Sequence, residues 1–123
     1  MNKAIMMAAG LAAGMFCSTA VARTANDLLN ECNKFLTITD NPAYQTSMTD
    51  AYEAGRCIAY IEGASDILQV EGTICLEEEV TSGQLARIVV NKAKASPYLL
   101  SKAPATLVYS ALAAHYLCPK PKQ

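Results

Sequence analysis

The sequence predicts an all-α protein: a small helical domain of about four helices with two disulfides, following an N-terminal signal peptide. Three observations carry this prediction. Apolar residues recur at helical spacing in four segments of the chain. Four cysteines lie within these segments or in their connections. The first residues of the chain have the composition of an export signal.

The N-terminal segment has the three parts of a secretory signal peptide. Lys3 provides a positive charge, residues 4–16 are apolar or small, and Ala20-Val21-Ala22 is the small-x-small pattern that signal peptidase accepts. The apolar run is shorter than the roughly 20 residues of a transmembrane helix. Phe16 stands where a lipid anchor on Cys17 would require a small residue, so no membrane anchor is expected. We expect cleavage after Ala22 and export to the periplasm; a buried N-terminal helix is the alternative.

Cleavage divides the chain into a signal peptide over 1–22, one helical domain over 23–119 and a short tail over 120–123. The loss of Lys3 lowers the formal net charge by one unit from −1. So weakly acidic a chain lacks the basic patch that binds nucleic acid or an anionic membrane surface. No nucleic-acid partner and no cofactor are expected.

The four remaining cysteines predict disulfides, because an even number in a small exported chain is typical of a disulfide framework. Their spacing is too wide for a zinc site of the C-x-x-C type. In an antiparallel hairpin of the first two helices, Cys32 and Cys57 lie at similar heights. Pairing Cys57 with Cys75 would require the loop to run back about 18 Å along its own helix. We therefore predict Cys32–Cys57 and Cys75–Cys118.

The first two predicted helices form this hairpin. The first runs from about Ala25 to Leu36, with Thr24 or Asn26 as its cap. A loop over Thr37–Thr46 is marked by Asp40-Asn41-Pro42. The second helix runs roughly from Ser47 to Val70, and the residues expected to line one side of it are Tyr52, Ala59, Tyr60, Gly63, Ile67 and Leu68.

Gly55, Ala59 and Gly63 form a stripe of small residues on the second helix, at steps of four. Small side chains let another helix approach closely, at a cost in helix propensity of about 1 kcal/mol per glycine. Packing within the domain is the favoured interpretation, and a dimer face is the alternative.

The third and fourth predicted helices follow a loop over Glu71–Val80. Thr81 and Gln84 form a capping box, and Pro97 ends the third helix. Its expected buried residues are Leu85, Ile88 and Val89. A tight connection leads to Pro104 in the first turn of the fourth helix. The expected core residues of that helix are Leu107, Val108, Ala111, Leu112 and Tyr116.

Residues that could support catalysis are scarce. His115 has no nucleophile and orienting group at suitable spacing, since the mature cysteines are assigned to disulfides and Ser110 falls on another side of the helix. Glu62 and Asp66 lie one turn apart, but a solvated face explains them better than acid–base chemistry. We therefore expect a non-enzyme.

Two loops are candidates for binding a partner. Glu77, Glu78 and Glu79 precede the third helix, where negative charge stabilises the helix dipole; contact with a basic partner is the alternative interpretation. Tyr98-Leu99-Leu100 is apolar for a short connection, and either folds onto the core or anchors a partner. The expected contact residues are Glu77, Glu78, Glu79, Tyr98, Leu99 and Lys102.

From Gly55 to Pro119 the chain resembles the Rap/Tai family of immunity proteins, which protect bacteria against amidase effectors of type VI secretion. The ordered pieces that carry the resemblance are Cys57, Tyr60-Ile61, Gly63, Asp66, Cys75, Val80-Thr81-x-Gly83-Gln84-Leu85, Pro97, Ala111-Leu112 and Cys118. The chain departs from the family pattern at Ala59, Glu77, Ser96 and Tyr116-Leu117.

The resemblance implies a periplasmic protein that binds a cognate peptidoglycan amidase toxin and blocks it sterically, with a loop in the active-site groove. It also implies a homodimer. The alternative function is a small periplasmic acid-stress chaperone, which would also be helical and disulfide-bonded.

Overall fold

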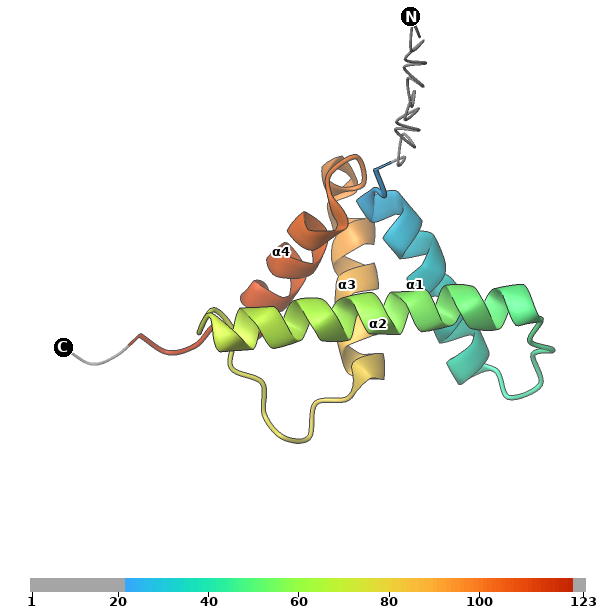
Figure 1. Ribbon diagram of the computed structural model, residues 1–123, viewed down its shortest axis with the longest axis horizontal. Helices are drawn as coiled ribbons and strands as arrows, with labels where there is room; N and C mark the ends of the chain where they lie inside the picture. Colours follow the sequence, from blue (N-terminus) through green and yellow to red (C-terminus); the bar gives the residue numbers. More distant parts are fainter. Residues whose placement is uncertain (1–21, 121–123) are drawn as a thin grey trace, which may run out of the picture.

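Four α-helices surround one hydrophobic core in the computed structural model, which describes residues 22–120 (Figure 1). They are α1 (Ala25–Asp40), α2 (Met48–Val70), α3 (Ser82–Ala95) and α4 (Pro104–Tyr116), with a short 3₁₀ helix η1 at Pro97–Leu99. Within residues 22–120 there is no β-strand, and Ile74 and Leu117 form an isolated antiparallel β-bridge. The predicted all-α class is thus confirmed. The predicted signal peptide falls almost wholly outside the described residues.

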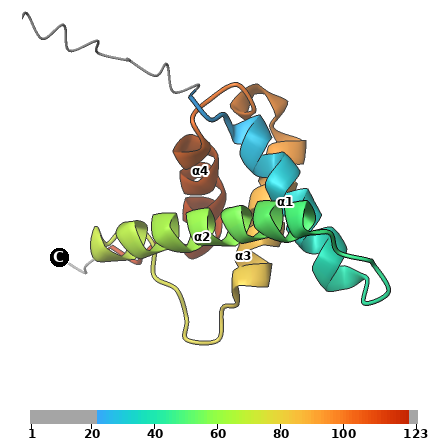
Figure 2. The same ribbon diagram turned by 45° about the vertical axis from the view of Figure 1, so that its right-hand side comes forward.

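The helix α2 lies across the other three helices (Figures 1 and 2). In both views, η1 lies on one side of α2 and the loop over residues 71–81 lies on the other. The core between the helices is apolar; its largest fully buried side chains include Leu28, Ile61, Ile74, Leu107 and Leu112.

Both predicted disulfides are present. Cys32–Cys57 joins α1 to α2 with a Cα–Cα distance of 5.0 Å. Cys75–Cys118 joins the loop after α2 to the residues after α4, with a Cα–Cα distance of 4.9 Å. Beside it, the Cys75 amide donates to the Tyr116 carbonyl at 2.8 Å. The disulfide and this hydrogen bond therefore tie the loop after α2 to the C-terminal end of α4.

The capping box predicted at Thr81 is confirmed, and Thr24, one of the two predicted caps of the first helix, is its cap. Thr24 and Ser47 also form full capping boxes, which the sequence analysis did not predict. At its other end α2 is followed by Gly72, which has a φ of 72°. This left-handed conformation suits glycine, so the loop leaves the helix here without strain.

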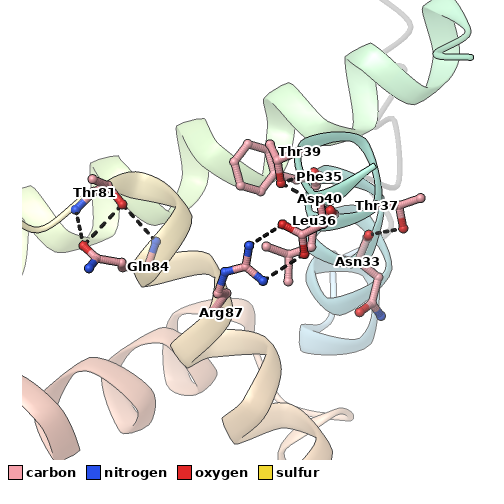
Figure 3. A network of polar contacts seen from close by, with 9 residues as sticks. All are labelled: Asn33, Phe35, Leu36, Thr37, Thr39, Asp40, Thr81, Gln84 and Arg87. Atoms are coloured by element: carbon pink, nitrogen blue, oxygen red, sulfur yellow. Dashed lines mark hydrogen bonds and ion pairs between the residues drawn. The ribbon is translucent and has the colours of Figure 1, made fainter. Parts of the chain in front are cut away.

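The end of α1 differs from the prediction, because the helix continues through Asp40 rather than stopping near Leu36. The Thr37 hydroxyl donates to the Asn33 carbonyl at 2.9 Å, so its side chain is accommodated within the helix (Figure 3). Asp40 then pairs with Arg87 of α3, with one contact at 2.9 Å. A carboxylate at a helix C-terminus opposes the dipole, and the Arg87 guanidinium offsets that cost. It also lowers the pKa of Asp40.

The buried face of α2 also differs from the prediction. Its buried residues are Ala54, Cys57, Ile61 and Ser65. Of the residues predicted to line one side, Tyr52 is 64% exposed and Ile67 is 58% exposed, whereas Tyr60 and Leu68 are partly buried against the core. The reason is the disulfide, because Cys57 must point toward α1, and residues three or four positions away share its face. The expected internal packing of Gly55, Ala59 and Gly63 is therefore wrong, since all three are exposed.

The other predicted faces are confirmed in the main. In α4, Leu107, Val108, Ala111 and Leu112 are buried. In α3, Leu85 and Val89 are buried, and Ile88 is partly buried against the core.

Removing the disulfide between α1 and α2 is expected to destabilise the domain. The double variant Cys32→Ala/Cys57→Ala should lower the free energy of unfolding by roughly 2–4 kcal/mol, because the unfolded chain regains the freedom of the 25-residue separation. Denaturant unfolding followed by circular dichroism measures the change. An unfolding midpoint equal to that of the parent would contradict this expectation.

Stability should also fall in acid, through Asp50. Lys34 lies 2.9 Å from this carboxylate, and the Ser47 amide and Tyr44 hydroxyl also donate to it. These contacts, Lys34 first, hold the pKa of Asp50 far below its usual range. The unfolded value is about 3.9. The stabilisation is therefore complete above that pH and is lost as the pH falls below it.

The measurement is the melting temperature between pH 5 and pH 3. We expect Asp50→Asn to reduce the drop that the parent protein shows in this window. Asp66→Asn is the control, because Asp66 lies on the exposed side of the same helix. An equal drop in parent and Asp50→Asn would show that other groups govern the acid transition.

Candidate partner-binding surfaces

The predicted contact residues lie at the two ends of α3. Glu77, Glu78 and Glu79 come before its first residue, and Tyr98 and Lys102 come after its last. The 14 residues of this helix span roughly 20 Å. Figures 1 and 2 show the two loops on opposite sides of α2. The fold therefore divides the predicted contact residues into two separate surfaces.

The acidic loop, residues 77–79, projects from the helices but is fixed at both ends. On one side Cys75 is held by the disulfide to Cys118. On the other side the Val80 amide donates to the Glu77 carbonyl at 3.2 Å, and Thr81 begins the capping box of α3. All three glutamates are exposed. Such an arrangement presents negative charge without using it for packing.

The second surface, which we call the Tyr98 end, is made by η1 and the residues up to Lys102. The carbonyls of Leu100 and Lys102 accept hydrogen bonds from the first amides of α1, Asn26 at 3.0 Å and Ala25 at 2.8 Å. These amides have no partner inside their own helix, so the connection satisfies them and is held rigidly. Tyr98 is 69% exposed on this rigid turn.

Leu99 does not contribute to the Tyr98 end. It is only 4% exposed and belongs to the hydrophobic core. Its predicted role as a contact residue is therefore corrected, because a buried side chain is not available to a partner in this conformation. The apolar connection therefore shows both of the arrangements considered in the sequence analysis: Leu99 folds onto the core, and Tyr98 points outward.

Few of the described residues are candidates for catalysis or metal binding. His115 is exposed on α4, and the centre of its ring lies 6.2 Å from that of Tyr116. Glu62 is exposed and accepts a hydrogen bond from the Ser82 hydroxyl at the start of α3. Over residues 22–120 no cluster of histidine, cysteine and carboxylate side chains could hold a metal ion. In the same range, no helix is long and apolar enough to cross a membrane.

A charged cluster that sequence reasoning missed joins the chain before α1 to α2. Glu31 is only 7% exposed and forms ion pairs with Arg23 and, at 3.1 Å, with Arg56. The Arg23 guanidinium lies 5.0 Å from the centre of the Tyr60 ring. Burial, followed by the charge of Arg56, lowers the pKa of Arg23. The signal was present in the sequence, because Glu31 precedes Cys32 and follows Leu28 by three positions on the buried side of α1.

The second feature is the outward face of α2, which the sequence analysis recognised as one side of the helix but expected to pack within the domain. A groove of about 570 Å³ lies between this face and α4, and its lining is almost wholly apolar. The lining residues are Ala59, Tyr60, Gly63, Ala64, Ile67, Leu68, Ala105 and Tyr109. Phasing the helix on Cys57 would have revealed this face from sequence alone.

These features define a class: a disulfide-bonded helical domain with exposed loops at the two ends of α3 and an apolar outer face on α2. The comparisons give its family. The family model of Rap1a immunity proteins matches residues 24–118, and the chain belongs to that family. Membership implies a non-enzymatic inhibitor that binds a cognate toxin. No match was found among curated proteins or among solved structures.

The charged cluster of Glu31, Arg23 and Arg56 should stabilise the folded domain. Glu31→Gln leaves Arg23 and Arg56 facing each other without the shared carboxylate. Breaking a buried ion pair is costly, although the 42% exposure of the Arg56 side chain reduces the effect. We expect a loss of about 2 kcal/mol in unfolding free energy, measured by denaturant unfolding. Glu53→Gln, in the same cleft, is the control; equal losses in both variants would contradict a special role for Glu31.

Proposed function

We propose that this protein is a periplasmic immunity protein that binds a peptidoglycan amidase effector of type VI secretion and blocks it sterically. Family membership is the observation that carries this proposal. The two disulfides support export, since such bonds form and persist in oxidising compartments. Inhibition by occupation requires a rigid surface and no catalytic group, which fits the arrangement of the described residues.

The Tyr98 end is the part of the surface that we assign to the active-site groove of the toxin. Interface energy concentrates in a few residues, among which tyrosine is enriched. Tyr98 combines high exposure with a backbone held by hydrogen bonds to α1, so little freedom is lost on binding. Lys102, also exposed, adds a positive charge at the same end.

The acidic loop has a different role in this proposal, because it lies at the other end of α3 and cannot enter the same groove. Surface charge acts mainly on association rates. Glu77, Glu78 and Glu79 would draw in a basic surface of the toxin without supplying much contact energy.

The homodimer that the family resemblance implies is a separate proposal, because a loop of a single copy can block the active-site groove of the toxin.

The sharpest test of the function is binding to the candidate amidase. We expect Tyr98→Ala to weaken binding by about 2 kcal/mol or more, which is roughly a 30-fold rise in Kd. Tyr98→Phe should retain most of the affinity, because it keeps the ring. Replacing the three glutamates by glutamine should slow association and flatten its salt dependence while dissociation stays unchanged.

Association and dissociation rates, together with protection of cells that express the toxin, decide between the outcomes. If only the glutamine variant loses protection, the Tyr98 assignment is wrong and the acidic loop is the contact. If no amidase is bound or inhibited by the parent protein, the proposed function itself is wrong. Circular dichroism must show that each variant remains helical.

The acid-stress chaperone remains the second candidate, and the exposed apolar face of α2 is the observation that favours it. A chaperone of this kind would suppress aggregation of denatured clients at about pH 3 and would do so without any toxin. If the protein inhibits an amidase and does not suppress aggregation in acid, the immunity function is supported and the chaperone function is wrong.

A further inference from the structure

The two disulfides of the domain lie in different surroundings. Cys32 and Cys57 are both fully buried, and their bond joins two helices inside the hydrophobic core. Cys75 is exposed and Cys118 is half-buried, and their bond joins two segments that lie outside the helices. Exchange with an external thiol requires that this thiol reach a sulfur atom of the disulfide. The second bond is therefore accessible to exchange, whereas the first is protected as long as the core stays closed.

Contacts that involve no sulfur also join the two segments that the exposed disulfide links. The Cys75 amide donates to the Tyr116 carbonyl at 2.8 Å, and the Cys118 amide donates to the Thr73 carbonyl at 3.3 Å. Between them Ile74, only 1% exposed, packs in the core. In both views the segment after α4 passes the C-terminal end of α2, where the loop begins (Figures 1 and 2). Loss of the S–S bond should therefore leave the helices and Ile74 in place.

The acidic loop, by contrast, depends on this disulfide. Within the described part of the chain, residues 76–79 take part in one hydrogen bond, from the Val80 amide to the Glu77 carbonyl at 3.2 Å. Leu76 and Val80, on either side of the three glutamates, are only partly buried against the core. The covalent bond at Cys75 fixes the start of the loop. Opening that bond should loosen the three glutamates while the helices keep their positions.

We propose that the Cys75–Cys118 bond is a site of thiol–disulfide exchange, at which a dithiol reductant releases the acidic loop while the helices stay folded. One thiolate of the reductant attacks the sulfur of Cys75, forms a mixed disulfide and expels Cys118 as a thiolate. The second thiolate of the reductant then attacks the reductant sulfur of the mixed disulfide and expels Cys75. The reductant gives up two electrons and becomes a disulfide, and the two protons from its thiols convert both cysteine thiolates to thiols.

The first test uses protein purified from the periplasm after expression of the full chain. It is treated with rising concentrations of dithiothreitol and then with an alkylating agent, and peptide mapping by mass spectrometry identifies the labelled cysteines. We expect a species that is labelled at Cys75 and Cys118, unlabelled at Cys32 and Cys57, and as helical as the parent by circular dichroism. Labelling of all four cysteines at once, or of Cys32 and Cys57 first, would overturn the proposal.

The second test measures the release of the loop with a glutamate-specific protease, which cuts after Glu77, Glu78 or Glu79 once the loop can enter its active site. Cleavage there should be at least about tenfold faster in the selectively reduced protein than in the oxidised protein, because the loop regains the freedom that the disulfide removes. Equal cleavage of the two forms would show that the disulfide does not restrain the acidic loop, and the proposal would be wrong.

The double variant Cys75→Ser/Cys118→Ser is the control for the reductant. It should be cleaved as fast as the reduced parent, and dithiothreitol should cause no further increase, because the buried disulfide is protected. Cleavage of this variant that still rises with dithiothreitol would assign the effect to Cys32–Cys57 and overturn the proposal. The experiment contains no toxin, so its outcome is independent of the proposed immunity function.

Discussion

The disulfide between Cys32 and Cys57 is the constraint on which the arrangement of the other helices depends. It fixes the rotation of α2 about its own axis, because Cys57 must face α1. Ala54 and Ile61, one turn to either side, are then directed into the core with it. The helix is apolar on two faces, so hydrophobicity alone would not have chosen between them. The covalent bond resolves that choice and leaves the second apolar face outside.

Polar contacts complete what the disulfide begins, and they act mainly on α1. Asp50 and Lys34 hold its middle to α2, while Arg87 of α3 holds its last residue. At its first residues, the carbonyls of Leu100 and Lys102 take the place of the missing helical partners. The same hydrogen bonds keep the Tyr98 end in shape. Stability of the fold and rigidity of a binding surface therefore arise from one set of contacts.

The three surfaces of the molecule have separate physical characters. The acidic loop carries charge, the Tyr98 end carries an aromatic side chain on rigid backbone, and the outer face of α2 carries apolar residues around small ones. Because α3 separates the first two and α2 lies across the front of the domain (Figure 2), a partner can occupy one of them without displacing another.

The sequence by itself determined the helical class, the capping box at Thr81 and both disulfide pairings, because these follow from local spacing and from heights along a hairpin. Tertiary structure decided three further points. It buried Leu99 while leaving Tyr98 exposed, it extended α1 to Asp40 through Arg87, and it turned Tyr52 and Ile67 outward. Each depends on a contact between segments far apart in the chain, which no local pattern contains.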